Sequence, residues 1–266
     1  MIRLTDKEFV DIVTFVKSNY GIDLSKKKQL IESRMYPILS ERKIDNFTDY
    51  FNLVKSSKSD EMVVMLNKLT TNHTYFMREP VHFEFFKNII LPKVEKENKN
   101  KVLRIWSAGC SSGEEAYTTV MVMKDFFGFQ NWDYRILATD ISARAIESAQ
   151  NSCYNKEALQ NLPPAWINKY FIKKGEDQYI LSQDIKNEVI FKYFNLMESF
   201  PFKKDFDLIF CRNVMIYFDQ ATKNQLIRRF YGMLKPGGYL FIGHSETVQN
   251  GSSSFKYIQP SIYQKG

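Results

Sequence analysis

Residues 102–115 read Val-Leu-Arg-Ile-Trp-Ser-Ala-Gly-Cys-Ser-Ser-Gly-Glu-Glu, and this stretch decides the fold. The apolar run over 102–106 predicts a buried strand, which leads through a loop of small residues into a predicted helix over 114–127. Gly109 and Gly113 let the loop backbone approach a ligand closely, as nucleotide-containing cofactors require at the edge of an α/β sheet. The stretch therefore predicts an α/β domain with a cofactor at this strand–helix turn.

Two acidic residues, Glu114 and Glu115, follow the last glycine of the loop, and the full GxGxxG pattern is missing. Carboxylates at a helix N-terminus occupy the place that a pyrophosphate would take, and they would repel it. This argues against NAD, FAD or ATP. It favours S-adenosylmethionine, a cofactor whose ammonium and sulfonium groups carry positive charge.

The rest of the chain beyond residue 102 alternates between strands and helices. Strands are expected over 135–139, 188–194, 206–211 and 238–243, helices over 143–150 and 220–234, and a hairpin over 255–263. This order predicts a doubly wound, Rossmann-like α/β sheet. Residues 154–187 do not fit the alternation and predict a small inserted antiparallel β-subdomain.

Residues 1–80 have a helical pattern instead of an alternating one. Thr5 stands three residues before Glu8, a capping-box spacing, and apolar residues follow it at helical intervals. The polar stretch that ends at Lys101 predicts a linker over 81–101. We therefore expect an all-helical N-terminal domain over 1–80, used for docking the substrate, and an α/β domain over 102–266.

Composition narrows the function classes. The chain has 266 residues and a formal net charge of +7, which favours acidic partners: nucleic acid, an anionic membrane surface or an acidic protein. Its three cysteines form no CxxC pair and its three histidines no ligand motif, so we expect no metal. Acidic residues near the N-terminus exclude a signal peptide there, and no apolar run is long enough to span a membrane. We expect a cytoplasmic protein.

Polar residues follow three further predicted strands. In open α/β sheets ligands bind at the carboxyl ends of the strands. Asp140 ends the second strand, where a carboxylate can accept hydrogen bonds from ribose hydroxyls. Asn195 follows the third strand and could read the adenine edge, and Arg212-Asn213 follows the fourth, beside the cofactor.

Four motifs together resemble the CheR family of chemotaxis receptor methyltransferases. They are Thr-Asn-His-Thr-Tyr-Phe-Met-Arg-Glu (71–79), Trp-Ser-Ala-Gly-Cys-Ser-Ser-Gly-Glu-Glu (106–115), Arg-Asn-Val-Met-Ile-Tyr-Phe (212–218) and Gly-His-Ser-Glu (243–246). The similarity runs in order along nearly the whole chain and includes Leu-Lys-Pro-Gly-Gly (234–238), which many S-adenosylmethionine enzymes share.

The resemblance implies methyl transfer from S-adenosylmethionine to glutamate side chains of chemoreceptors, giving methyl esters and S-adenosylhomocysteine. It implies a helical N-terminal domain and a methyltransferase domain with a β-subdomain. It places Arg78 and Tyr217 nearest the reacting methyl, and leaves open whether Glu114 or Glu115 binds the methionine amino group. Together with the strand-to-helix loop, it assigns cofactor binding to Asn72, Thr74, Arg78, Gly109, Glu115, Asp140, Asn195, Leu196, Arg212 and Asn213.

A glutamate substrate is already ionised at neutral pH, so the reaction needs positioning groups and no general base. The expected partners are chemoreceptor helices bearing glutamates, with Lys26–Lys28 and Arg34 as a candidate docking face. Some family members also bind a receptor C-terminal peptide through the β-subdomain, and residues 154–187 leave this open here.

Two alternatives remain at this point. One is a non-catalytic module that binds the cofactor and docks on receptors. The other is a nucleic-acid methyltransferase, for which Asn161–Trp166 (Asn-Leu-Pro-Pro-Ala-Trp) resembles the adenine-methylation motif in the wrong place. We expect no nucleic-acid partner, because the chain has no dense cluster of basic and aromatic residues.

Overall fold

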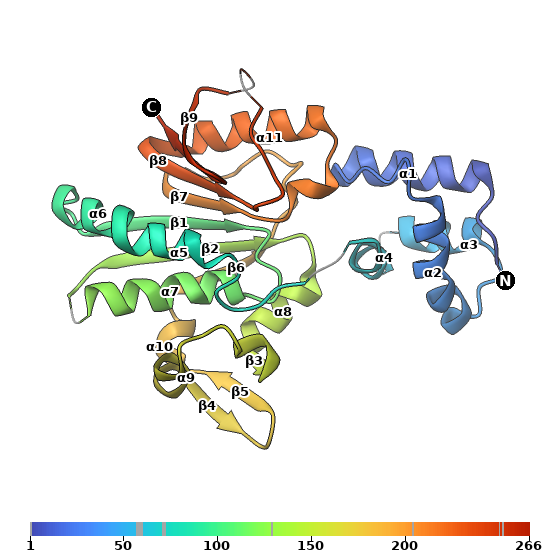
Figure 1. The fold of residues 1–266 in the computed structure, drawn as a ribbon. Coiled ribbons are helices and arrows are strands. Elements are labelled where there is room, and N and C mark those ends of the chain that lie inside the picture. Colours follow the sequence, from blue (N-terminus) through green and yellow to red (C-terminus); the bar gives the residue numbers. More distant parts are fainter. Residues whose placement is uncertain are drawn as a thin grey trace.

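The computed structural model describes residues 2–56, 61–70, 73–128, 130–203, 205–249, 251 and 253–266. Helices of the N-terminal part lie at one end of the molecule, and a mixed sheet flanked by helices forms the larger part (Figure 1). This confirms the predicted fold class, a helical N-terminal domain followed by a Rossmann-like α/β domain.

The N-terminal domain is built from amphipathic helices that bury one face. The predicted capping box starts the first helix: Glu8 N donates to Thr5 Oγ1 at 3.3 Å, and Thr5 N donates to Glu8 Oε2 at 2.9 Å. Gly21, in the left-handed conformation at φ 72°, ends it. The helices are α1 (Asp6–Tyr20), α2 (Lys28–Arg42), α3 (Phe47–Lys55) and α4 (Glu61–Leu69).

Among the described residues the strands form a seven-stranded main sheet, ordered β6-β2-β1-β7-β8-β10-β9, and a three-stranded small sheet, ordered β3-β5-β4. Strands β6, β2, β1, β7 and β8 run parallel, while β10 and β9 add an antiparallel edge. The main-sheet bounds are β1 (Val102–Ala108), β2 (Asp133–Asp140), β6 (Val189–Tyr193), β7 (Phe206–Cys211), β8 (Leu234–Ile242), β9 (Phe255–Gln259) and β10 (Ile262–Lys265).

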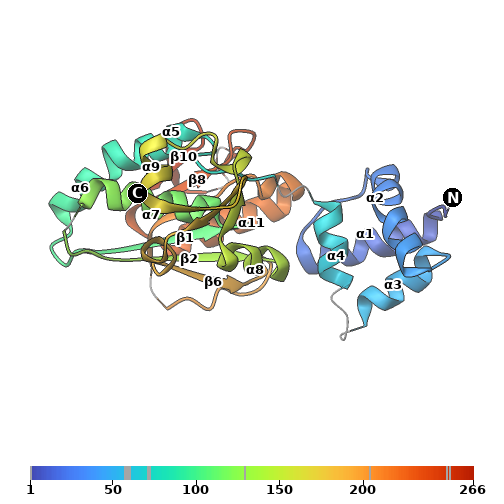
Figure 2. The same ribbon diagram turned by 90° about the horizontal axis from the view of Figure 1, so that it is seen from below.

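Helices cover both faces of the main sheet (Figure 2). Because side chains alternate along a strand, Leu103 and Ile105 of β1 join one core while Trp106 and Ala108 join the other. The first core also holds α7 (Glu114–Phe127) and α8 (Ala143–Asn151), and the second holds α11 (Gln220–Met233) and the N-terminal helices.

Residues 81–101, expected to be a linker, contain a helical segment that packs on the α/β domain. It comprises α5 (Pro80–Phe85), the π-helical turn η1 (Phe86–Ile90) and α6 (Leu91–Glu97). Phe83, Phe86 and Leu91 are buried in the first core. The polar residues that suggested a linker lie partly on the exposed side of α6 and partly after it, at 98–101. The structure differs from the expectation because one face of the segment is apolar.

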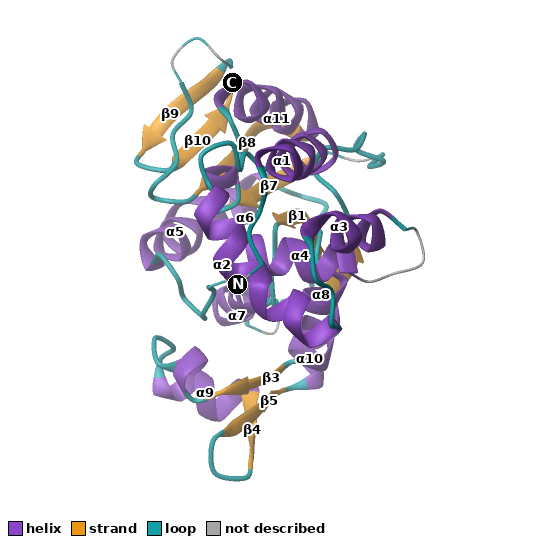
Figure 3. Ribbon diagram, turned by 90° about the vertical axis from the view of Figure 1, so that its right-hand side faces the viewer, coloured by secondary structure: helices purple, strands orange, loops and turns teal. Residues whose placement is uncertain are grey.

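The predicted insertion forms the small sheet, which lies below the main sheet in Figure 1 and stands apart from it in Figure 3. Its strands are β3 (Cys153–Asn155), β4 (Phe171–Lys174) and β5 (Gln178–Leu181), accompanied by α9 (Pro164–Tyr170) and α10 (Gln183–Lys186). The Tyr154 hydroxyl donates to the carbonyl of Ser112 at 2.7 Å, which ties this subdomain to the loop after β1.

The N-terminal domain contacts the α/β domain beside α11, where α1 lies next to it (Figures 1 and 3). Lys17 Nζ lies 2.7 Å from Asp219 Oδ2 at the start of α11, and Asp23 N donates to the carbonyl of Tyr217 at 2.8 Å. These contacts bring the end of α1 to the carboxyl edge of the main sheet. None of the helices in the described part of the chain is long and apolar enough to cross a membrane.

Candidate functional site

A cavity with about 1030 Å³ of empty space, its mouth included, lies at the carboxyl ends of the parallel strands. In the sheet, β2 and β6 lie on one side of β1, and β7 and β8 lie on the other. The strand order therefore reverses at β1, and the cavity lies at this switch point. Nine predicted cofactor residues line it: Thr74, Arg78, Gly109, Glu115, Asp140, Asn195, Leu196, Arg212 and Asn213. The tenth, Asn72, lies outside the described residues.

The loop after β1 forms one wall, and its shape depends on Gly109. This residue has φ 96°, and a Cβ atom there would lie 2.3 Å from Cγ2 of Val214. The loop is held against β2, because Gly109 N donates to the Thr139 carbonyl and Ser111 N donates to Asp140 Oδ2, both at 2.8 Å. Only glycine combines this backbone conformation with such a close approach.

Asp140, at the end of β2, faces the cavity with its carboxylate fixed by backbone donors. Besides Ser111 N, its other oxygen, Oδ1, accepts a hydrogen bond from Ser142 N at 2.9 Å. Burial raises the pKa of Asp140, although these backbone hydrogen bonds act in the opposite direction. The arrangement leaves an oriented acceptor at the strand end, where the sequence predicts contact with ribose hydroxyls.

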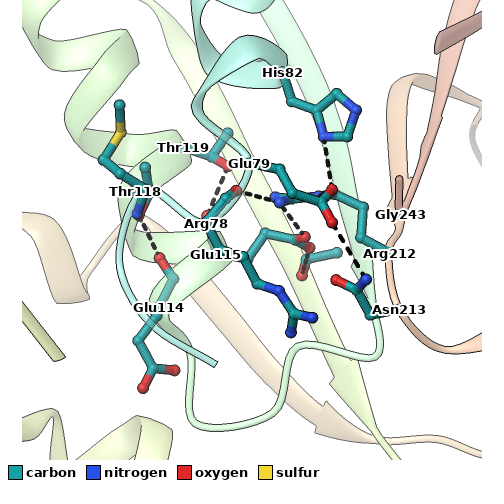
Figure 4. Close-up of polar contacts among 12 residues, drawn as sticks. Arg78, Glu79, His82, Glu114, Glu115, Thr118, Thr119, Arg212, Asn213 and Gly243 are labelled. Atoms are coloured by element: carbon teal, nitrogen blue, oxygen red, sulfur yellow. Dashed lines mark hydrogen bonds and ion pairs between the residues drawn. The ribbon is translucent and has the colours of Figure 1, made fainter. Parts of the chain in front are cut away.

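The two adjacent acids of α7 point in different directions (Figure 4). Glu115 lines the cavity, where its Oε1 accepts from Ser107 Oγ at 2.6 Å and its Oε2 from Arg212 Nη1 at 3.2 Å. Glu114 does not line it, and its carboxyl group is held by Ser112 Oγ at 2.9 Å. Of the two candidates for the amino group of the cofactor, the geometry favours Glu115.

Glu114 is 4% exposed, and burial raises the pKa of its carboxyl group to about 7. The unfolded chain releases this proton near the ordinary value of 4.5, so the folded state holds it over a higher pH range. Binding of this proton therefore stabilises the folded state. Its contribution to the free energy of unfolding is complete below pH 4.5 and is lost as the pH rises through about 7.

We therefore expect Glu114→Gln to be stabilised relative to the wild type by about 2–3 kcal/mol more at pH 8 than at pH 4.5, since one pKa unit corresponds to ~1.4 kcal/mol. Urea unfolding of both proteins at the two pH values measures the difference. The exposed Glu147 of α8 provides the control, Glu147→Gln. A Glu114→Gln curve parallel to the wild type across this pH range would contradict the assignment.

Arg212, which follows β7, is the centre of the polar contacts in Figure 4. Its side chain is 2% exposed, and its Nε lies 3.2 Å from Glu79 Oε2 while Nη1 reaches Glu115. Its Nη2 also donates to the carbonyl of Arg78. Arg212 therefore connects the loop after β7, helix α7 and the segment that carries Arg78.

Asn195 and Asn213 line the cavity, but their amide groups already bind the protein. Asn195 Nδ2 donates to the carbonyl of Asn19 at 2.7 Å, and its Oδ1 accepts from Met197 N at 3.0 Å. Asn213 Nδ2 donates to Glu79 Oε1 at 3.3 Å. In this structure the Asn195 side chain fixes the junction with the N-terminal domain, so contact of its amide with an adenine edge stays a prediction.

The two predicted catalytic residues lie on the same cavity. Arg78 follows α4 in a segment with left-handed backbone at Met77 and Glu79, both at φ 58°, and its Nη1 donates to the His73 carbonyl. Tyr217 comes from the 3₁₀ turn η3 (Met215–Tyr217) after β7. The fold brings together two residues that are far apart in the sequence.

Several residues of this site were not singled out by the sequence analysis. Tyr20 and Ile22 of the N-terminal domain line the cavity, and no local pattern indicates this, because the contact depends on how the domains pack. Glu246 accepts hydrogen bonds from the backbone of Asn213 and Ile216, both at 3.0 Å, and so anchors the Tyr217 turn. Glu246 ends the Gly-His-Ser-Glu motif, which is a signal that could have identified it.

Comparisons with known proteins decide the family. The family profile "CheR methyltransferase, SAM binding domain" matches residues 72–263, and "CheR methyltransferase, all-alpha domain" matches residues 7–70. The chain belongs to the CheR methyltransferase family. This confirms the resemblance seen in the sequence.

Curated CheR relatives match over nearly their whole length. The chain is 45% identical to "Chemotaxis protein methyltransferase" of Borreliella burgdorferi, with 99% of this chain and 96% of the relative covered. It is 34% identical to the protein of that name in Escherichia coli, with 98% and 92% covered. Identity to "Chemotaxis protein methyltransferase 1" of Pseudomonas aeruginosa is 33%, with 93% and 92% covered.

The cofactor of this CheR protein is S-adenosylmethionine, and the donor set of the cavity fits it. Glu115 offers a carboxylate to an ammonium group, and Asp140 offers one to ribose hydroxyls. Apolar side chains, among them Ile141 and Leu196, suit an adenine ring. Glu115, at the start of α7, would repel a diphosphate group in this cavity.

Proposed function

We propose that this protein methylates glutamate side chains of chemoreceptors, forming glutamate methyl esters for sensory adaptation. The observation that carries the proposal is the placement of Arg78 and Tyr217 on the wall of the cofactor cavity, in a chain of the CheR family. The relatives' names describe chemotaxis methyltransferases, and the glutamate ester is what membership of the CheR family implies.

The proposed cofactor contacts follow from the cavity. Glu115 would hold the ammonium group and Asp140 the ribose, while Gly109 leaves room for close approach and Leu196 packs on the adenine. Thr74 and Asn213 line the same walls. When bound, S-adenosylmethionine supplies an electrophilic methyl group on its sulfonium.

Arg78 and Tyr217 would orient the substrate carboxylate. A guanidinium can bind a carboxylate through two parallel hydrogen bonds and so fix its direction. The Tyr217 hydroxyl can then restrict the substrate from the side of the β7 loop. An ionised glutamate is itself the nucleophile, so the contribution of these residues is orientation rather than proton transfer.

The proposed partners are receptor helices that carry the glutamates, and the N-terminal domain is proposed to dock them. Lys26 and Lys27 are exposed in the segment between Ile22, on the cavity wall, and α2. Lys28 is engaged by Asp6 at 2.6 Å, and Arg34 Nη1 donates to the Lys68 carbonyl at 3.0 Å. Within the basic docking face predicted from the sequence, we propose Lys26 and Lys27 as the side chains that meet the receptor. Cytoplasmic location and peptide binding by the β-subdomain stay predictions.

The proposal is tested with tritiated S-adenosylmethionine and membranes containing chemoreceptors. The expected result is label in the receptor that mild base releases as methanol, because carboxyl methyl esters are base-labile. Cofactor binding without label in the receptor would favour a non-catalytic docking module. Label in added RNA or DNA, or base-stable label in the receptor, would also overturn the proposal.

Reversing the charge of Lys26 and Lys27 to Glu should weaken receptor methylation, with an increase of about 5- to 10-fold in the KM for receptor. The Kd for S-adenosylhomocysteine should not change. Because exposed charges are screened, the difference from the wild type should shrink when salt is raised from about 0.05 to 0.5 M.

The matched control reverses Lys96 and Lys99, which are exposed at the far end of the α/β domain around α6. This control keeps the net charge of the test variant. An equal loss in both variants would show that the total charge, and not the proposed docking face, determines receptor affinity.

A further inference from the structure

Three buried or half-buried charged side chains on the cavity wall and behind it form the triad Glu79–Arg212–Glu115. Arg212 lies between the two carboxylates, at 3.2 Å from an oxygen of each, and its guanidinium stacks over Phe83 at 5.4 Å. Two negative charges and one positive charge leave the triad with a net charge of −1. Arg78 lies on the same cavity and its charge also acts on Glu115, so a cationic ligand group at Glu115 depends on the excess negative charge of the triad.

Glu79 is the member of the triad that is fully engaged by the protein. Its Oε2 faces Arg212, and its Oε1 accepts from Asn213 Nδ2 and His244 N, both at 3.3 Å. Burial raises the pKa of Glu79, but Arg212 and these hydrogen bonds outweigh it and leave the pKa below its ordinary value. The lowered pKa favours the ionised form of Glu79, and its carboxylate does not line the cavity.

Glu115 behaves in the opposite way. Burial raises the pKa of Glu115, and Arg212 and Ser107 offset this only in part. Its carboxylate lines the cavity, whereas that of Glu79 does not. The two acids thus share one arginine but differ in what remains available to a ligand.

We infer that Glu79 is the counterion of Arg212, and that it thereby leaves the charge of Glu115 free for the ammonium group of the cofactor. The inference rests on the proposed role of Glu115. Without the negative charge of Glu79, Arg212 would have Glu115 as its remaining carboxylate partner. The pair would then be neutral, and the ammonium group would meet no net negative charge.

Two histidines beside Glu79 raise the question of a metal site instead. Glu79, His82 and His244 offer ligand atoms within 4.8 Å of one another, and His82 is fully buried. Burial, with the charge of Arg212, lowers the pKa of His82 to about 3, so it is neutral. The cation at this carboxylate is the Arg212 guanidinium, which would repel a metal ion and already balances the charge of Glu79.

The test compares two ligands by isothermal titration on the full chain at pH 7.5. S-Adenosylhomocysteine carries the ammonium group, and 5′-methylthioadenosine has the same adenosine and thioether but no amino-acid group. For Glu79→Gln we expect the Kd of S-adenosylhomocysteine to rise about 10-fold or more, as for loss of a charge-assisted contact. The Kd of 5′-methylthioadenosine should stay within about 2-fold.

Two further variants complete the design. Glu79→Asp keeps the charge and should retain most of the affinity that Glu79→Gln loses. Glu84→Gln changes an exposed acid on α5, the helix that directly follows Glu79, and should bind both ligands like the wild type.

Each outcome decides between roles. An equal loss for both ligands in Glu79→Gln would mean a structural role and overturn the inference, as would no loss for either. If Glu115→Gln also leaves S-adenosylhomocysteine binding unchanged, the proposed role of Glu115 has failed. A selective loss in Glu115→Gln with none in Glu79→Gln refutes the counterion role alone.

Discussion

Arg78→Ala should lower the rate of receptor methylation at saturating substrates by about 100-fold or more, with the Kd for S-adenosylhomocysteine raised by less than about 10-fold. The large effect is expected because misplacement of a reacting group by about 1 Å can cost 100-fold in rate. Arg78 lines the cavity from the segment after α4, and its guanidinium is the group we propose to orient the substrate carboxylate.

The backbone around Arg78 supports this separation of rate from cofactor affinity. Both neighbours, Met77 and Glu79, have left-handed conformations, which other contacts must hold in place. One such contact is the hydrogen bond that the Arg78 carbonyl accepts from Arg212 Nη2. Removing the side chain keeps this backbone contact, so the cavity wall should persist in the variant.

Single-turnover methylation of receptor membranes measures the rate, and titration with S-adenosylhomocysteine measures binding. Arg78→Lys should remain strongly impaired, because an ammonium group cannot make the two parallel hydrogen bonds of a guanidinium. Arg144→Ala, at an exposed position of α8, is the matched control and should be fully active. Turnover of Arg78→Ala within about 3-fold of the wild type would remove Arg78 from the proposed mechanism.

The α/β architecture could be predicted because its elements have local signals. The strands are apolar runs bounded by polar residues, and Gly109 and Gly113 mark the turn into α7. The segment 81–101 was harder, since its end is strongly polar. Its buried residues, such as Phe86 and Ile90, are spaced as a helix face, and the partner that covers this face lies elsewhere in the chain. Pattern alone does not show which surface a helix will cover.

The site could be predicted where topology alone determines position. Asp140 ends β2 and Arg212 follows β7. The carboxyl ends of parallel strands lie at the same edge of the sheet, so both side chains reach the cavity there. The ion pair between Glu79 and Arg212 joins residues 133 positions apart and depends on the packing of α5 against the sheet. Tyr20 likewise reaches the cavity because the C-terminal end of α1 meets the start of α11, where Lys17 pairs with Asp219. Long-range partners of this kind have no signature in a single sequence.

Glu115→Gln should raise the Kd for S-adenosylhomocysteine about 10- to 100-fold, the second large effect expected in this protein. The carboxylate of Glu115 faces the cavity between Ser107 and Arg212. A charge-assisted hydrogen bond in a buried site contributes about 1.5–3 kcal/mol, which corresponds to this range of Kd. The amide keeps the size of the side chain and removes the charge that the ammonium group of the cofactor requires.

Glu114→Gln is the matched control, because it changes the neighbouring acid on the same helix turn. Its carboxyl group is directed to Ser112, so the Kd should change by less than about 3-fold. Titration of both variants at pH 7.5 therefore assigns the methionine amino group to one of the two acids. A larger loss in Glu114→Gln than in Glu115→Gln would reverse the assignment. It would also mean that the α7 N-terminus turns when the cofactor binds, since Glu114 does not line the cavity in this structure.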